Sequence, residues 1–262
     1  AAVEAGKPVV TTVHGLFAPR DWLANLSQRL YLHSVGAWAL RNSSRVVCLT
    51  KSDAKEVAEL GVERRNIRVI PIAVDPDSFD PRGPKRELIV WAGRLVPEKG
   101  LETLLDAVAS LCRKRSIRLI IVGDGPMKNR LIHRAHTLGI SDLVTFRFKA
   151  DRSEVAELLR ESEILVLPSF KEGLPMILLE AMASANMIIA SKLSPIIEVL
   201  GEAGLYFTPG EPSELESALL KALTDRELQR HKGQAAREIV MERFSWSVVL
   251  PMLEDLYHEV IT

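Results

Sequence analysis

Short β-branched runs alternate with helical patterns along most of the chain, and this alternation restricts the possible folds more than any other feature. In the longer stretch, strands are expected at 88–93, 117–122, 144–146, 164–168, 187–191 and 205–207. Alternation at this spacing predicts a doubly wound α/β domain with a parallel sheet. A shorter βαβαβ pattern precedes it, with strands at 8–13, 45–50 and 67–72 and a helix capped by Ser52. Three strands bury only a small core, so this first domain is expected to be incomplete.

A proline-rich segment divides the chain. Residues 71–87 carry four prolines and many charges without any periodicity, which is typical of a linker. Around it we expect a partial Rossmann-like domain over 1–78 and a complete Rossmann-like domain over 79–244. A last helix over 245–262 is expected to pack back toward the first domain.

Charge and cysteine content exclude several classes of protein. Basic and acidic residues balance at 34 each, so no nucleic-acid partner is expected from the overall charge. Cys48 and Cys112 are too few for a disulfide framework, and no signal peptide or membrane-spanning run appears. A cytoplasmic location is therefore expected, with peripheral contact to a membrane left open.

The stretch SFKEGLPMILLEAMASA, residues 169–185, reads as a loop that turns into a buried helix. Glu172 lies in the loop, and Glu180 lies inside the apolar helix. The amides of Gly173 and Leu174 come where a helix N-terminus leaves donors unpaired, which favours an anion. The run could be core alone, but a carboxylate inside an apolar helix needs a partner. A ligand with both phosphate and hydroxyl groups would suit this combination.

Two cations flank the loop AGRLVPEKG that follows the strand at 88–93, namely Arg94 and Lys99. In doubly wound sheets ligands bind at the carboxyl ends of the strands, so both cations should face the same crevice as Glu172. An arginine fork and a lysine point charge together suit a diphosphate. The alternative is that both are solvated loop charges.

Metal ligands are not expected. Asp75 and Asp77 form an Asp-x-Asp pair, but the pair lies in the proline-rich linker. His133 and His136 share a helix face without an evident third ligand, so they are interpreted as surface histidines.

The spaced set GR-x4-KG followed by E-GLPMILLE resembles the donor domain of the retaining family 4 glycosyltransferases, which have the GT-B fold. Further matching segments occur in the family's order: PVVTTVHG, VVCLTKSDAKEV, GDGP, VTF and LVLPSFKEGLP. The resemblance covers nearly the whole chain. The chain lacks what the family has before PVVTTVHG, which implies a missing first part of the N-terminal domain.

The resemblance implies a role for each candidate residue. Glu172 would lie beside the transferred sugar as a catalytic residue, and His14 would approach that sugar from the first domain. Glu180 would bind the ribose hydroxyls. The donor diphosphate would be held by four residues: Arg94, Lys99, Gly173 and Leu174.

The implied reaction moves a hexose from a nucleotide-diphosphate sugar to a sugar, lipid or other hydroxyl acceptor, with retention and without a metal or other cofactor. A nucleotide-sugar epimerase and a donor-binding chain without transfer activity are the alternatives. The missing strands would also leave an open sheet edge, so self-association through residues 8–13 or 45–50 is expected.

Overall fold

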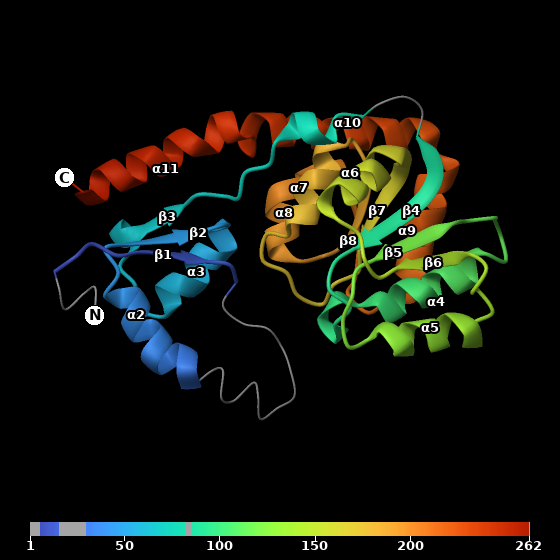
Figure 1. Ribbon diagram of the computed structural model, residues 1–262, viewed down its shortest axis with the longest axis horizontal. Coiled ribbons are helices and arrows are strands. Elements are labelled where there is room, and N and C mark those ends of the chain that lie inside the picture. The colour runs from blue at the N-terminus through green and yellow to red at the C-terminus, as the bar shows by residue number, and fades with distance from the viewer. Residues whose placement is uncertain (1–5, 16–29, 82–84, 262) are drawn as a thin grey trace.

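The computed structural model describes residues 6–15, 30–81 and 85–261, and these form two parallel sheets in two α/β domains (Figure 1). The smaller sheet has three strands in the order β1-β2-β3. The larger has six, in the order β6-β5-β4-β7-β8-β9. The predicted fold class, α/β with two Rossmann-like parallel sheets, is confirmed.

The first domain is built on β1 (Val10–Val13), β2 (Arg45–Cys48) and β3 (Ile67–Val69). Its helical segments are η1 (Leu32–Gly36), α2 (Ala37–Arg41), α3 (Lys51–Glu59) and η2 (Arg64–Asn66). Because β2 pairs with β1 on one side and β3 on the other, residues 45–48 cannot offer an open edge. The prediction of self-association through 45–50 was therefore wrong. The outer side of β1 has no partner strand among the described residues.

Helix α3 begins two residues earlier than the sequence suggested, because Thr50 and not Ser52 is its N-cap. The Thr50 hydroxyl accepts a hydrogen bond from the Asp53 amide at 3.0 Å, and the Asp53 carboxylate accepts one from the Thr50 amide at 3.1 Å. This reciprocal capping box satisfies two backbone donors at once. The N-terminus of α3 is therefore firmly defined.

The described part of the linker packs on the second domain. It contains the short helix η3 (Pro76–Phe79), and Phe79 is 1% exposed within the core of the second domain. The Val74 amide donates to the Phe244 carbonyl at 2.8 Å. The linker is thus anchored to the domain that follows it.

The second domain contains all six strands of the larger sheet. They are β4 (Arg86–Ala92), β5 (Leu119–Val122), β6 (Val144–Arg147), β7 (Ser162–Leu167), β8 (Met187–Ser191) and β9 (Gly204–Phe207). Its helices are η4 (Pro97–Lys99), α4 (Leu101–Leu111), α5 (Lys128–Thr137), α6 (Arg152–Glu161), α7 (Met176–Ala183), α8 (Ser194–Leu200), η5 (Gly201–Ala203), α9 (Pro212–Thr224) and α10 (Arg226–Arg243). One buried cluster joins the sheet to α4, α5 and α9, and another joins it to α6, α7, α8 and α10. Helices therefore cover both faces, as a parallel sheet requires.

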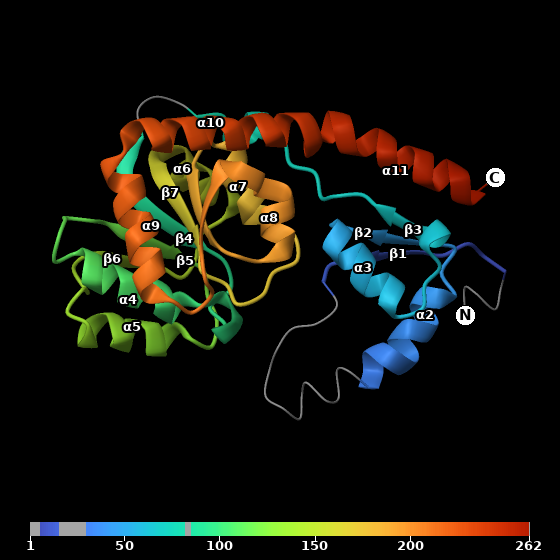
Figure 2. The same cartoon turned by 180° about the vertical axis from the view of Figure 1, so that it is seen from behind.

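The last helix, α11 (Trp246–Ile261), extends from the second domain over the first (Figure 2). Its side chains Val249 and Leu256 are buried in a cluster with Val47 of β2 and with Ile70 and Ala73 beyond β3. Polar contacts add to this packing, because Glu259 pairs with Arg45 at 2.7 Å and also with Arg68. Within the described part of the chain, no helix is long and apolar enough to cross a membrane.

Candidate functional site

The strand order reverses between β4 and β7, so the loops after these two strands flank the crevice where doubly wound sheets bind ligands. The two loops touch. Gly100 has φ 64°, and a methyl group there would lie 1.9 Å from the Pro168 carbonyl oxygen. The Phe170 amide also donates to the Glu98 carbonyl at 2.9 Å. Glycine at position 100 therefore permits the direct crossing of the two loops.

An ion pair lies at this crossing. Lys99 Nζ is 2.7 Å from Glu172 Oε1 and 2.8 Å from Oε2, and the two side chains are 21% and 8% exposed. The buried Ser169 hydroxyl donates to Glu172 Oε1 at 2.6 Å. The structure thus brings together two of the predicted site residues, one from each loop. The sequence predicted a shared crevice, but it gave no sign of the direct contact or of Ser169.

Helix α7 begins directly after the loop that holds Glu172. Pro175 is its N-cap residue and has extended backbone angles, and no side chain caps the helix. The amides of Met176 and Ile177 occupy the first two helical positions, where no acceptor exists within the helix. Just before them, Leu174 is 6% exposed and packs in the buried cluster that also contains residues of α7. These amides carry a partial positive charge at the end of the loop that holds Glu172.

Arg94 follows β4 and Gly93, on the same loop as Lys99. Its side chain is exposed, and its guanidinium has no ion-pair partner among the described residues. Arg94 therefore differs from Lys99 in lying at the open rim of the crevice.

Glu180 is buried on α7, with 8% of the residue exposed. Arg152, at the start of α6, lies 3.4 Å from Glu180 Oε1 and is itself 70% exposed. Burial raises the pKa of the Glu180 carboxyl, and Arg152 offsets part of this effect. Arg152 is the partner that a carboxylate in an apolar helix requires. Sequence reasoning missed it, because nothing local links the two positions.

His14 lies at the carboxyl end of β1 and is exposed. The loop that holds Glu172 reaches it: a methyl group on Gly173 would lie 3.5 Å from the His14 carbonyl oxygen and 3.7 Å from the Gly15 amide nitrogen. The structure therefore places His14 at the boundary between the domains, next to the loop that holds Glu172.

The weaker metal candidates have structural roles or lie on the surface. The Asp75 carboxylate accepts hydrogen bonds from the Asp77 amide at 3.3 Å and the Ser78 hydroxyl at 2.6 Å, so it caps η3. His133 and His136 are exposed on α5. Across residues 6–15, 30–81 and 85–261, no group of three His, Cys, Asp or Glu side chains is placed to hold a metal ion.

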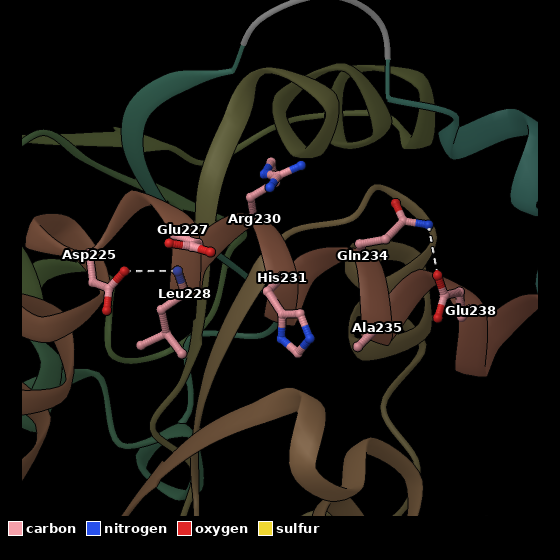
Figure 3. A pocket seen from close by; sticks show the side chains of 8 residues that line it. All are labelled: Asp225, Glu227, Leu228, Arg230, His231, Gln234, Ala235 and Glu238. Atoms are coloured by element: carbon pink, nitrogen blue, oxygen red, sulfur yellow. Dashed lines mark hydrogen bonds between the residues drawn. The ribbon is translucent and has the colours of Figure 1, made fainter.

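A separate hollow of about 450 Å³ runs along α10 (Figure 3). Its lining residues are Asp225, Glu227, Leu228, Arg230, His231, Gln234, Ala235 and Glu238. Two of the polar groups serve the helix itself: Asp225 accepts a hydrogen bond from the Leu228 amide at 2.8 Å, and Gln234 donates to Glu238 at 3.1 Å. Three carboxylates and one arginine are among the lining residues, and this excess of negative charge disfavours a diphosphate. The hollow contains none of the predicted site residues.

Comparisons with known proteins all point to glycosyltransferases. The sequence profile of the glycosyl transferases group 1 matches residues 77–239, and that of Glycosyltransferase Family 4 matches residues 1–78. The MMP alpha-(1->4)-mannosyltransferase of Mycolicibacterium hassiacum is 30% identical over 98% of the chain. A glycogen synthase of Mycobacterium tuberculosis is 28% identical over 95% of it. The chain spans 66% and 63%, respectively, of the lengths of these two relatives.

Solved structures match the fold. Sucrose-phosphate synthase from Thermosynechococcus elongatus superposes with a TM-score of 0.84 at 23% identity, over 96% of this chain and 67% of that one. Anabaena HepE in complex with UDP-glucose gives a TM-score of 0.84 at 22% identity, over 98% of this chain and 74% of that one. Both likenesses extend over both domains. The chain belongs to the glycosyl transferases group 1 family and has its GT-B fold.

Proposed function

We propose that the chain binds a nucleotide-diphosphate sugar where the loops after β4 and β7 cross, and that the protein transfers the hexose to a hydroxyl acceptor with retention. One observation carries this proposal: Lys99 and Glu172 pair at 2.7 Å at the switch point of the sheet, beside the uncapped start of α7. Cation, carboxylate and open amides are thus available within one crevice.

The diphosphate end of the donor would meet Lys99, the amides near Gly173 and Leu174, and Arg94 at the rim. A leaving diphosphate gains negative charge in the transition state, and fixed cations and amides stabilise that charge without reorganising. Lys99 is held by Glu172, so its ammonium is fixed in place before the donor binds. A metal ion is then not needed for charge stabilisation.

Glu172 would lie beside the transferred sugar. Its carboxylate is fixed by Lys99 and Ser169 and is shielded from water. A fixed carboxylate stabilises the positive, oxocarbenium-like sugar that forms as the glycosidic bond breaks. The nearby end of β1 supports a role for His14 on the other side of the same sugar.

Glu180 would bind the ribose of the donor. An ionised carboxylate only accepts hydrogen bonds, and the two ribose hydroxyls are donors of matching type. Arg152 pairs with Oε1, which leaves Oε2 for such a ligand. Because the side chain is mostly buried, each hydrogen bond that it makes is shielded from competing water.

The names of the relatives favour transfer over epimerisation. The proteins compared above are called transferases and synthases, and HepE was solved in complex with UDP-glucose. The epimerase alternative receives no support from them. We therefore infer that uridine diphosphate sugars are the first donors to test.

The test is calorimetric titration with UDP, GDP and ADP and with their glucose, mannose and N-acetylglucosamine forms, followed by NMR analysis of any product. One diphosphate series should bind in the wild type and bind less tightly after Lys99→Ala, while the exposed-site control Lys221→Ala should behave as wild type. An α-linked product from an α-linked donor would establish retention. Equal affinity in all three proteins would overturn the proposed site, and binding without any turnover would identify the donor-binding alternative.

A further inference from the structure

A carboxylate of the second domain occupies the N-terminus of a helix in the first. Glu198 of α8 accepts a hydrogen bond from the Lys51 amide at 2.8 Å through Oε1 and from the Ser52 amide at 3.2 Å through Oε2. These amides are the first two of α3 and have no acceptor within the helix. The positive end of the helix dipole further favours a carboxylate there. Figures 1 and 2 show α3 on the side of the first domain that faces α8.

The loop that holds Glu172 meets the same helix. Lys171 is partly buried beside it: burial lowers the pKa of its ammonium group, and the nearby carboxylates of Glu56 and Asp53 on α3 offset part of that shift. Leu49, at the end of β2, is 6% exposed and belongs to the buried cluster of the second domain. Helix α3 therefore contacts α8 and lies close to the loop that holds Glu172.

Packing near Glu198 is incomplete. A cavity of about 270 Å³ lies between the domains, and its lining includes Leu49, Lys51, Pro71, Glu198, Phe244 and Met252. Dispersion contacts are lost across such a gap, so packing holds the two domains together less firmly there. The paired hydrogen bonds of Glu198 have a defined direction and so fix the orientation that packing leaves free.

We propose that Glu198 is a positioning residue that clamps α3 to the second domain and so brings the end of β1 against the loop that holds Glu172. This inference rests on the proposed transfer function for its kinetic consequence only. The donor contacts proposed above come almost entirely from the second domain, whereas His14 comes from the first. Loss of the clamp should therefore slow transfer from bound donor and leave donor affinity nearly unchanged.

Two kinds of variant remove the clamp from opposite sides. Glu198→Ala removes the acceptor. Lys51→Pro removes the stronger donor, and proline is well tolerated at the first helical position. Thr50 has φ −135° and ψ 162°, the extended conformation that a residue before proline adopts. Lys51→Ala is the matched control, because it loses the same side chain but keeps the amide.

The first measurement is the distance between the domains, by electron paramagnetic resonance with spin labels on Glu59→Cys of α3 and His133→Cys of α5. Cys112 is replaced by alanine, and burial raises the pKa of Cys48 to about 12, so that thiol resists labelling. Wild type, Lys51→Ala and Glu202→Ala, an exposed glutamate of η5, should give one narrow distribution. Glu198→Ala and Lys51→Pro should both give a broader one. Five identical distributions would overturn the clamp, whatever reaction the protein catalyses.

The second measurement is kinetic and uses the full-length protein. Glu198→Ala and Lys51→Pro should lower kcat by about tenfold, as expected for lost hydrogen bonds to a charged group, with donor Kd changed less than about twofold. Glu198→Gln keeps one acceptor oxygen and should recover part of the rate. An unchanged kcat in a protein with broadened distances would overturn the positioning role, and so would a loss of donor affinity that accounts for the whole effect. If the wild type transfers no sugar, the proposed function fails, and the distance measurement alone decides the clamp.

Discussion

The six-stranded sheet is covered on both faces by helices of its own domain. In the three-stranded sheet, by contrast, one face is covered by α11, the last helix of the chain. On that face, Val249 and Leu256 of α11 pack with Val47 of β2. The proposed donor contacts follow the same division, because all of them except His14 come from the second domain. Donor binding should therefore depend mainly on the second domain. Transfer should depend on how the first domain is held against it.

The largest effect expected from this difference is on stability. Trp91 on β4 is 1% exposed, and Trp91→Ala should destabilise the second domain by about 3 to 5 kcal/mol and abolish donor binding. Leu256→Ala, with a cost of about 2 to 5 kcal/mol, should instead release the first sheet and leave donor binding intact. Hydrogen exchange read by mass spectrometry distinguishes them, with the exposed neighbour Tyr257→Ala as control. Loss of protection in β4–β9 after Leu256→Ala would contradict this division between the two domains.

The next effect concerns catalysis where the two domains meet. In the full-length protein, Glu172→Ala should lower the rate from bound donor by roughly 10² to 10³, the size expected when one preorganised electrostatic group is lost. Donor affinity should change much less, because the cations and amides remain. Single-turnover kinetics at saturating donor measure this rate directly. A rate within twofold of wild type would remove Glu172 from the catalytic machinery.

The two cations of the loop after β4, Lys99 and Arg94, should contribute unequally to donor affinity. Lys99→Ala leaves a mostly buried Glu172 carboxylate unpaired next to the diphosphate, so affinity should fall by about 2 to 4 kcal/mol. Arg94 is exposed to solvent, and Arg94→Ala should cost less than about 1 kcal/mol. Calorimetry with a nucleoside diphosphate gives both values. The double variant Lys99→Met/Glu172→Gln should regain part of the loss, and no recovery would show that repulsion by Glu172 contributes nothing.

The smallest effect is a pH dependence at Glu180. Burial raises the pKa of its carboxyl in the folded protein, so the stability that this group contributes at low pH is lost as the pH rises through that pKa. Glu180→Gln should therefore stabilise the second domain at pH 8, and the gain should vanish at low pH, where glutamate is protonated in both the folded and the unfolded state. Thermal unfolding at both pH values tests this. A less stable Gln variant at pH 8 would contradict the assignment.

Local patterns predicted the fold class well, because β-branched runs and helical periodicity are properties of neighbouring residues. The strand order is not local, and for this reason β2 was expected at an edge although it lies between β1 and β3. The rule that strand ends share one edge was enough to place Lys99 and Glu172 in the same crevice.

The supporting residues could not be predicted in this way. Ser169, Arg152 and Glu198 act through contacts that depend on how the elements pack in three dimensions. Glu198, for example, reaches an amide 147 residues away in the sequence. Similarly, α3 is capped by Thr50 and not by the expected Ser52, because the Asp53 side chain can accept a hydrogen bond from the Thr50 amide while the Thr50 side chain accepts one from the Asp53 amide.

Hydrogen exchange with and without a nucleoside diphosphate, in separate runs with UDP, GDP and ADP, shows directly whether the donor binds where the β4 and β7 loops cross. One of the three ligands should slow exchange in residues 93–101 after β4 and 169–180 around the start of α7. The hollow along α10, residues 225–238, and the strands of the first domain should exchange at the same rate as without ligand. Protection confined to 225–238, or no protection by any of the three diphosphates, would contradict a donor site at the crossing of the β4 and β7 loops.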